Sequence, residues 1–157
     1  MAAGEIKKEA LLVVEKVLVK ASEDIEKGEV IYNDGNGFLA APAGVDGKLY
    51  VALESHDCSE ESEHYIRAVA MGCVTVQKKA GTALKEGDLV IVSSTDGEVT
   101  KFTDYTDQVW GGASSYWTTT LYGNLQTAVN RVKGILGTVA EDAASAATQV
   151  TVWVGVK

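Results

Sequence analysis

Four residues of types that bind transition metals lie together in the stretch HDCSEESEH, at positions 56–64. They are His56, Asp57, Cys58 and His64. Their spacing matches none of the ligand patterns of closed tetrahedral zinc sites. An acidic polar loop between two strands would contain the same residue types without binding a metal. The sequence therefore favours a surface loop here and predicts no metal site.

Ser114 and Ser115 follow a pair of glycines and are candidates for a catalytic nucleophile. Hydrolases present their nucleophile in a Gly-x-Ser-x-Gly turn, whereas the order here is Gly-Gly-Ala-Ser-Ser-Tyr. The paired carboxylates Glu60–Glu61 and Glu141–Asp142 lie in stretches typical of solvated loops. The sequence offers no reason to assign either pair to acid/base catalysis. We therefore expect no catalytic residues and a protein that is not an enzyme.

Lys78 and Lys79 stand near Gly81 in an expected loop, which raises the idea of a lysine that carries a lipoyl or biotinyl group. Carrier domains place that lysine at a hairpin tip between methionines, and Met71 is too distant. The run Asp34-Gly35-Asn36-Gly37 resembles part of a calcium-binding loop but lacks the terminal bidentate Glu. We interpret this run as a hairpin turn and expect no cofactor.

The sequence contains an internal repeat, which predicts the strands and turns of the fold. The stretch ASEDIEKGEVIYNDGNGFLA, residues 21–40, aligns with AGTALKEGDLVIVSSTDGEVTK, residues 80–101, at an offset of 59. The similarity continues, because residues 47–54 resemble residues 133–141. Each copy contains an acidic turn, a glycine, an apolar strand, a glycine turn and a second strand. Two copies are too few for a solenoid, so we expect a duplicated module that closes one small barrel or sandwich.

The composition supports a mainly β fold. The chain has 157 residues, 46% of them apolar, and 21 are valines, which suit half-buried pleated surfaces. Alternating apolar residues predict strands over residues 13–20, 66–76 and 150–156, with the valines at 150, 152, 154 and 156 on the core face. The length suits a single domain over residues 13–157.

Two segments lie outside this pattern. Residues 1–12 mix charged and small side chains, and we expect them to form an N-terminal arm. Residues 104–133 stand where the first copy has only a short loop, and they carry several aromatic residues. Apolar residues at 121, 125, 128, 129 and 132 recur at helical spacing before Gly134. We expect a loop followed by a short helix that covers one opening of the barrel.

Charge and hydropathy exclude several classes of partner. The formal net charge is −8 and the pI is about 4.7, so the overall field repels phosphate backbones and anionic lipid surfaces. We expect no nucleic acid and no membrane as partners. No run reaches the roughly 20 apolar residues of a membrane span, and residues 1–20 lack a signal-peptide core. Cys58 and Cys73 are predicted to be reduced thiols in a protein made in the cytoplasm.

In the order of its motifs, the chain resembles the small capsid decoration, or cement, proteins of tailed bacteriophages and related viruses and proviruses. The resemblance spans residues 13–156 without the insert at 104–133. It rests on the stretches KASEDIEKGEVIYNDGNGFLAAPAG, GKLYVALES, EHYIRAVAMGCVTV, AGTALKEGDLVIVSSTDGEVTKF and KGILGTVAEDAASAATQVTVWVG. The insert is longer than is usual in this family.

The resemblance implies a non-enzymatic structural protein that binds the outer surface of a mature capsid. Its partners would be the major capsid protein and other copies of itself, with which it would form a homotrimer. Its place would be the virion, on the outer capsid surface. We expect the arm to reach the capsid shell and the aromatic residues of the insert to contact a neighbour or cap the barrel. The residues concerned are Glu5, Ile6, Lys7, Lys8, Leu11, Leu12, Trp110, Tyr116, Trp117 and Tyr122.

Two alternatives remain open at this point. One is a small binding module of the carbohydrate-binding or SAF-like type, whose strands also favour the sequence pattern Asp-Ile-x-x-Gly-x-x-Ile. In that case the aromatic residues of the insert would stack on sugar rings. The other is an enzyme whose site the sequence does not reveal.

Overall fold

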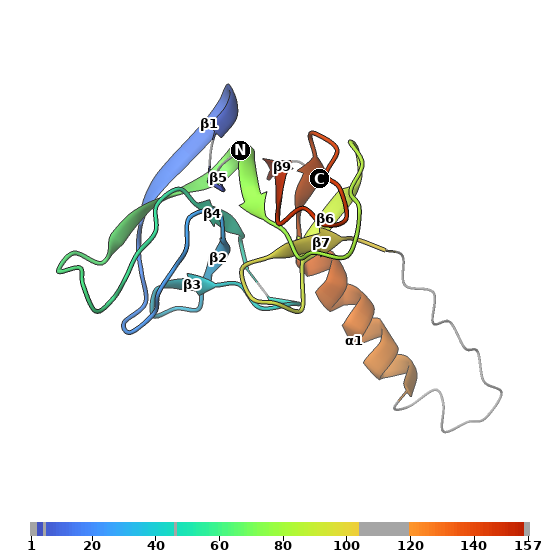
Figure 1. Ribbon diagram of the computed structural model, residues 1–157. Helices are drawn as coiled ribbons and strands as arrows, with labels where there is room; N and C mark the ends of the chain where they lie inside the picture. The colour runs from blue at the N-terminus through green and yellow to red at the C-terminus, as the bar shows by residue number, and fades with distance from the viewer. Residues whose placement is uncertain (1–2, 5, 46, 104–119, 156–157) are drawn as a thin grey trace.

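The computed structural model describes residues 3–4, 6–45, 47–103 and 120–155 (Figure 1). The predicted mainly β architecture with one short helix is confirmed. The strands are β1 (Ile6–Leu18), β2 (Val30–Asn33), β3 (Phe38–Ala40), β4 (Tyr50–Ala52), β5 (Tyr65–Gln77), β6 (Leu89–Val92), β7 (Val99–Lys101), β8 (Ile135–Val139) and β9 (Gln149–Val154). Helix α1 (Thr120–Lys133) lies between β7 and β8.

The sequence repeat corresponds to two copies of one β-module. In the first module β2 pairs with β3 and β4, and β4 pairs with β5. In the second module β6 pairs with β7 and β8, and β8 pairs with β9. Strand β5 belongs to both modules, because residues 68–69 pair with β4 of the first module and residues 72–77 pair with β9 of the second; β1 also pairs along residues 65–74 of β5. One long strand therefore joins the two modules, which lie side by side in Figure 1.

In each module a residue that follows a long strand, β1 or β5, forms a backbone bridge with the second strand of the module's hairpin, β3 or β7. Val19 forms a single parallel bridge with Phe38, and Lys78 forms the corresponding bridge with Val99. Residues 19 and 78 are separated by the same 59 positions as the two copies of the sequence repeat. All nine strands of the described residues belong to one antiparallel sheet, in the order β3-β2-β4-β5-β9-β8-β6-β7 with β1 beside β5. The two bridges bring its end strands β3 and β7 back towards the residues after β1 and β5, so each half is curled and barrel-like.

Valines fill the core, as their number predicted. Val74, Val76, Val90 and Val152 are fully buried in the larger apolar cluster. A second cluster fills the first module and contains Val17, Val19, Ile25, Ile31, Phe38, Ala52, Ile66 and Ala68. On β9 the valines at 150, 152 and 154 are buried as predicted. Thr151, expected on the outer face, is also buried, and its hydroxyl donates a hydrogen bond to Glu141 at 3.2 Å.

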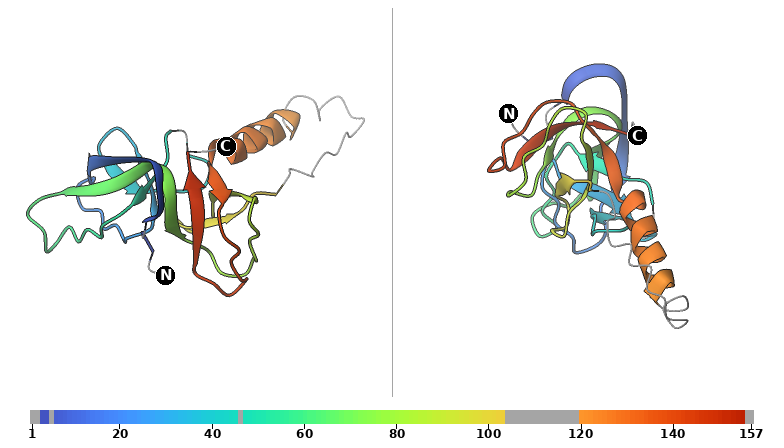
Figure 2. Two further views of the ribbon diagram at one scale, coloured as in Figure 1. Left: turned by 90° about the horizontal axis from the view of Figure 1, so that it is seen from above. Right: turned by 90° about the vertical axis from the view of Figure 1, so that its right-hand side faces the viewer.

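The N-terminal residues differ from the expected arm. Strand β1 begins at Ile6, and β5 pairs with it from Val74 to Tyr65, with the register shifting between Lys8 and Val13. Figure 2 shows β1 as an arch beside the barrels. Ala3 is buried, and the amide of Gly4 donates to the carbonyl of Thr75 at 2.7 Å. Strand β1 thus runs through residue 12, where the sequence placed the boundary between arm and barrel, and its pairing with β5 is irregular up to Val13.

Helix α1 confirms the predicted helix but not its orientation. Its last turns approach the second module through polar side chains: Arg131 donates to the hydroxyl of Thr103 at 2.8 Å, and its guanidinium lies over the ring of Phe102. Asn130 lies beside Gly44. The rest of the helix projects away from the barrels (Figure 1). The expectation that this helix covers a barrel opening is therefore wrong, because its polar side, not its apolar side, faces the strands.

Candidate interaction surfaces

The two histidines of the 56–64 loop lie within hydrogen-bond distance of each other. The Nε2 atom of buried His56 lies 3.0 Å from Nδ1 of His64, and Glu61 lies 4.0 Å from the same Nε2. Asp57 accepts hydrogen bonds from the amide and hydroxyl of Ser59, which lower the pKa of the Asp57 carboxyl. Among the described residues no three metal-binding side chains are placed to share an ion.

Lys78 is buried and serves as an internal anchor. Its ammonium group donates to the carbonyl oxygens of Lys79 at 3.1 Å, Ser145 at 3.3 Å and Ala147 at 3.1 Å. Burial lowers the pKa of the Lys78 ammonium, because desolvation disfavours its charged form. A side chain held inside the protein in this way is not displayed to a modifying enzyme, so this geometry does not fit a carrier lysine.

The hairpin predicted at residues 34–37 is confirmed, because β2 and β3 pair on either side of it. The amide of Asp34 donates to the carbonyl of Gly37. The φ angles of Gly35 and Gly37 are 99° and 139°, values that favour glycine. The Asp34 carboxylate lies 2.7 Å from the ammonium of Lys20. This carboxylate is thus held by a lysine and by the turn itself. Ser114 and Ser115 lie outside the described residues.

Exposed apolar side chains are concentrated on two separate surfaces. The first, which we call the ribbon patch, lies on the paired strands β1 and β5 and consists of Val13, Val14, Leu18, Tyr65 and Met71. Leu18 is directly opposite Tyr65 in the strand register, and 51% of Tyr65 is exposed. The second, the helix stripe, consists of Leu125, Val129 and Val132. These eight residues are all the large apolar residues that are exposed in the described part of the chain.

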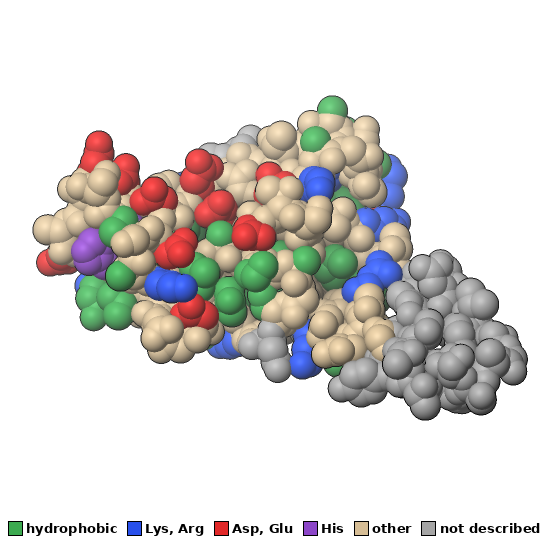
Figure 3. Space-filling model, turned by 90° about the horizontal axis from the view of Figure 1, so that it is seen from below, with side chains coloured by type: hydrophobic (Ala, Val, Ile, Leu, Met, Phe, Trp, Pro, Cys, Tyr) green, Lys and Arg blue, Asp and Glu red, His purple; other side chains and the backbone are tan. Residues whose placement is uncertain are grey.

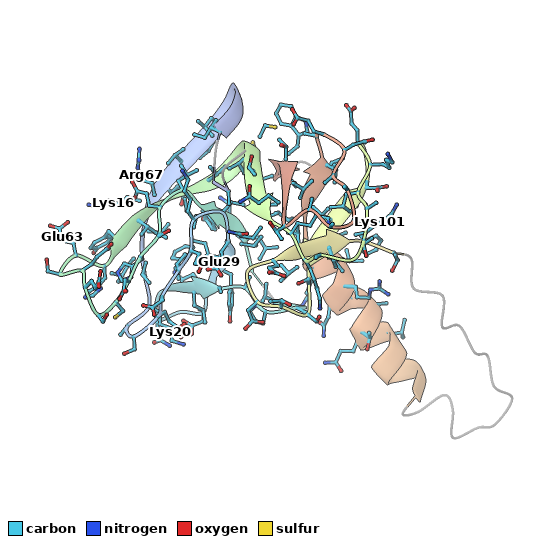
Figure 4. The ribbon with its side chains drawn as sticks, viewed as in Figure 1. Lys16, Lys20, Glu29, Glu63, Arg67 and Lys101 are labelled. Carbon is cyan, nitrogen blue, oxygen red and sulfur yellow. The ribbon has the colours of Figure 1, made fainter. Side chains whose placement is uncertain are left out.

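Basic side chains accompany the ribbon patch. Lys16 and Arg67 face each other across β1 and β5, as their labels in Figure 4 show. The Lys16 ammonium lies 5.0 Å from the centre of the Tyr65 ring. The Arg67 side chain pairs with Glu54 at 2.7 Å, and hydrogen bonds from the amide and guanidinium of Arg67 lower the pKa of Glu54. The patch is therefore an apolar surface with ordered charged groups, a composition common in protein interfaces.

The predicted contact residues fall at different ends of the molecule. Ile6, Lys7, Lys8, Leu11 and Leu12 lie on β1, and Tyr122 lies on α1. Leu12 packs against the larger core cluster, so it serves the fold. Glu5, Trp110, Tyr116 and Trp117 lie outside the described residues.

Sequence reasoning missed the ribbon patch. The alternation of Val17 and Val19 with Leu18 and Lys20 was its signal, because two buried valines place Leu18 on the opposite side of the strand.

A hollow of about 280 Å³ lies between the ribbon patch and the base of α1. Val13, Met71, Leu49 and Leu136 contribute apolar walls, and Lys133 lies at its edge. Its described lining contains no carboxylate, histidine, cysteine or hydroxyl group. The hollow therefore offers an apolar recess next to the ribbon patch and no group suited to acid/base or nucleophilic chemistry.

Comparison of the chain with protein-family models, with curated proteins and with solved structures found no match. Within the described residues, no helix has the length and apolar character needed to cross a membrane.

Proposed function

We propose that this protein binds the outer surface of a mature viral capsid and stabilises it, as a head decoration or cement protein without enzymatic activity. The observation that carries the proposal is the ribbon patch, an exposed apolar surface on β1 and on β5, the strand that joins two barrel-like modules. Large exposed apolar patches commonly mark protein contacts. The order of sequence motifs that resembles decoration proteins supports the same function.

The ribbon patch is the proposed contact with the major capsid protein. Its residues lie on β1 and β5, whose pairing fixes Leu18 beside Tyr65. Tyr and Met are among the residue types enriched in interface cores. Residues 5–12, which the sequence suggested would reach the shell, belong to or adjoin the same strand β1. The proposed contact thus extends the expected arm along the full length of β1.

Stabilisation would follow from several weak contacts acting together. A homotrimer places three ribbon patches on one capsid surface, and the effective concentration of the second and third contacts strengthens the first. Neighbouring capsid subunits that share one trimer separate only when these contacts break together. A capsid whose subunits are joined in this way would resist the outward pressure of a packed genome.

The test is co-sedimentation of the purified protein with undecorated, expanded heads of the virus that encodes it. We expect saturable binding at a whole-number ratio per capsomer, and heads that withstand heating better once decorated. Leu18→Glu places a charge in the ribbon patch and should reduce binding by at least tenfold. Gln126→Glu introduces a charge at an exposed position of α1 outside the ribbon patch and serves as the control, because it should leave capsid binding unchanged.

Deletion of the N-terminus is a poorer test of capsid contact. Ala3 and Gly4 are buried against Lys27 and Gly28, so removing them would also disturb the first module. Absence of binding by the full-length protein to heads in every maturation state would refute the capsid proposal. Quenching of tryptophan fluorescence by an oligosaccharide would then favour a carbohydrate-binding module.

A further inference from the structure

Helix α1 presents its apolar residues to solvent, which is unusual for a helix attached to a barrel. Leu125, Val129 and Val132 are 58%, 51% and 56% exposed. The opposite side of the helix makes the attachment, through Arg131 to Thr103 and through Asn130 beside Gly44. In most surface helices the apolar side faces the core. The attachment by the polar side therefore leaves the helix stripe free to bind something else.

The helix also lacks the local features that would stabilise it alone. It has 14 residues and no acidic residue in its first turn, and Gly123 and the β-branched Thr127, Val129 and Val132 lower its intrinsic propensity. Isolated helices of about 12–15 residues are marginal in water even with favourable sequences. Packing of the apolar side against a partner is the contribution that would stabilise it.

The spacing of the apolar positions indicates another helix as the partner. Positions 121, 125, 128 and 132 are separated by four, three and four residues, which is the spacing of a heptad seam. Such a seam packs against a second helix with the same spacing. Among the described residues α1 is the single helix, so this part of the chain offers it no partner helix, whereas a second copy would supply one with identical spacing.

The charge distribution favours association at this end of the molecule. Residues 1–77 contain 7 Lys and Arg against 14 Asp and Glu, whereas residues 78–157 contain 7 against 8. Figure 3 shows the same asymmetry, with acidic side chains concentrated over the first module and basic side chains gathered towards the helix. Contact through α1 brings together the halves with nearly balanced charge and keeps the acidic first modules apart, which reduces self-repulsion.

We propose that α1 is a self-association element, which packs through Leu125, Ala128 and Val132 against α1 of other copies of this chain. This inference deepens the proposed function, because it names the surface that joins the copies, but it concerns association in the absence of capsid. The ribbon patch stays outside this contact, since it lies on β1 and β5 and approaches only the base of α1 at Lys133, while the rest of the helix projects away from the strands (Figure 1).

The test is the mass of the full-length protein in solution, measured by light scattering and sedimentation equilibrium over a dilution series. The chain mass is 16.6 kDa, and we expect a whole-number multiple of it that falls on dilution. Leu125→Glu should give 16.6 kDa throughout. Helical content measured by circular dichroism should fall together with the mass, and because Leu and Glu are both good helix formers, that fall would report the lost packing and not a lower intrinsic propensity.

Two variants make the comparison specific. Gln126→Glu adds the same charge one position away, on the exposed polar side of the helix, and should keep the wild-type mass. Leu125→Met keeps an apolar side chain and should also associate.

A wild-type protein that stays at 16.6 kDa at all concentrations would overturn the proposal and would indicate that another segment or a different partner covers the stripe. An unchanged mass for Leu125→Glu would overturn it as well, by placing the contact elsewhere. Because Leu18→Glu tests capsid binding and Leu125→Glu tests self-association without capsids, failure of one proposal is distinguishable from failure of the other.

Discussion

The carboxylates of Glu29 and Asp88 occupy the same place in the two modules. Each accepts a hydrogen bond from the backbone amide three residues earlier, at 2.9 Å in both cases. Their surroundings differ: Glu29 is partly buried near Glu26, Glu98 and Asp96, whereas Asp88 lies 2.9 Å from the Lys101 ammonium. Desolvation, together with these neighbouring carboxylates, raises the pKa of Glu29, and the bond to Lys101 lowers the pKa of Asp88.

Glu29→Gln should stabilise the protein at pH 7. The amide oxygen of Gln can accept the same backbone hydrogen bond, and the substitution removes a partly desolvated charge that has three acidic neighbours. We expect the free energy of unfolding, measured with urea, to rise relative to the wild type. A decrease would show that the charge itself is needed at this junction.

Asp88→Asn is the matched change in the second module and should have the opposite effect. The substitution keeps an acceptor for the backbone amide but removes the ion pair with Lys101. Because this pair is partly exposed, we expect a loss of about 0.5–1 kcal/mol at pH 7 and low salt. Added salt should reduce the difference between the two proteins. Equal stability at low salt would contradict the assignment.

The two carboxylates also predict opposite pH effects. The native pKa of Glu29 is raised above 4.5, so its charge destabilises the fold above that native pKa, and the effect disappears as the pH falls to 4.5 and below. The advantage of Glu29→Gln over the wild type should therefore shrink between pH 7 and pH 4.5. Asp88 has a native pKa below 3.8, so its stabilising contribution should persist at pH 4.5 and be lost in stronger acid. Urea unfolding at three pH values measures both trends.

Lys78→Met should destabilise the second module. Met keeps the length of the apolar stem but leaves the carbonyls of Ser145 and Ala147 without the ammonium donor. We expect a loss of about 1–3 kcal/mol in the free energy of unfolding. Lys79→Met is the control, because Lys79 is partly exposed and bonds the hydroxyl of Ser94. Equal effects of the two substitutions would argue against a special role for the buried lysine.

Gly137→Ala should be among the most damaging single substitutions in the described chain. A Cβ at this position would lie 1.8 Å from the carbonyl oxygen of Trp153 on the neighbouring strand β9, so the backbone of β8 or β9 must move. Overpacking of this kind costs about 1–3 kcal/mol, and more when backbone is displaced. Gly123→Ala is the control, since a Cβ there meets open space, and it should strengthen α1. Thermal unfolding followed by circular dichroism compares the two variants.

Much of the fold was predictable because it depends on local patterns. The repeat of residues 21–40 at residues 80–101 indicated two equivalent modules, and the alternation of valines on β9 identified the core face. The hairpin at residues 34–37 followed from its glycines. These features depend on backbone geometry and on the period of two residues in a strand, both of which can be read along the chain.

The surfaces could not be predicted in the same way, because they depend on what packs next to each element. The amphipathic pattern of residues 121–132 predicted a helix but not that Arg131 and Asn130 would attach it by its polar side. The sequence of residues 6–12 indicated an arm but not that Ile6 and Lys8 would pair with β5. The sequence by itself determined the modules, since apolar periodicity and turn residues act locally. Tertiary structure alone decided which faces stay open, because burial is a property of both partners in a contact.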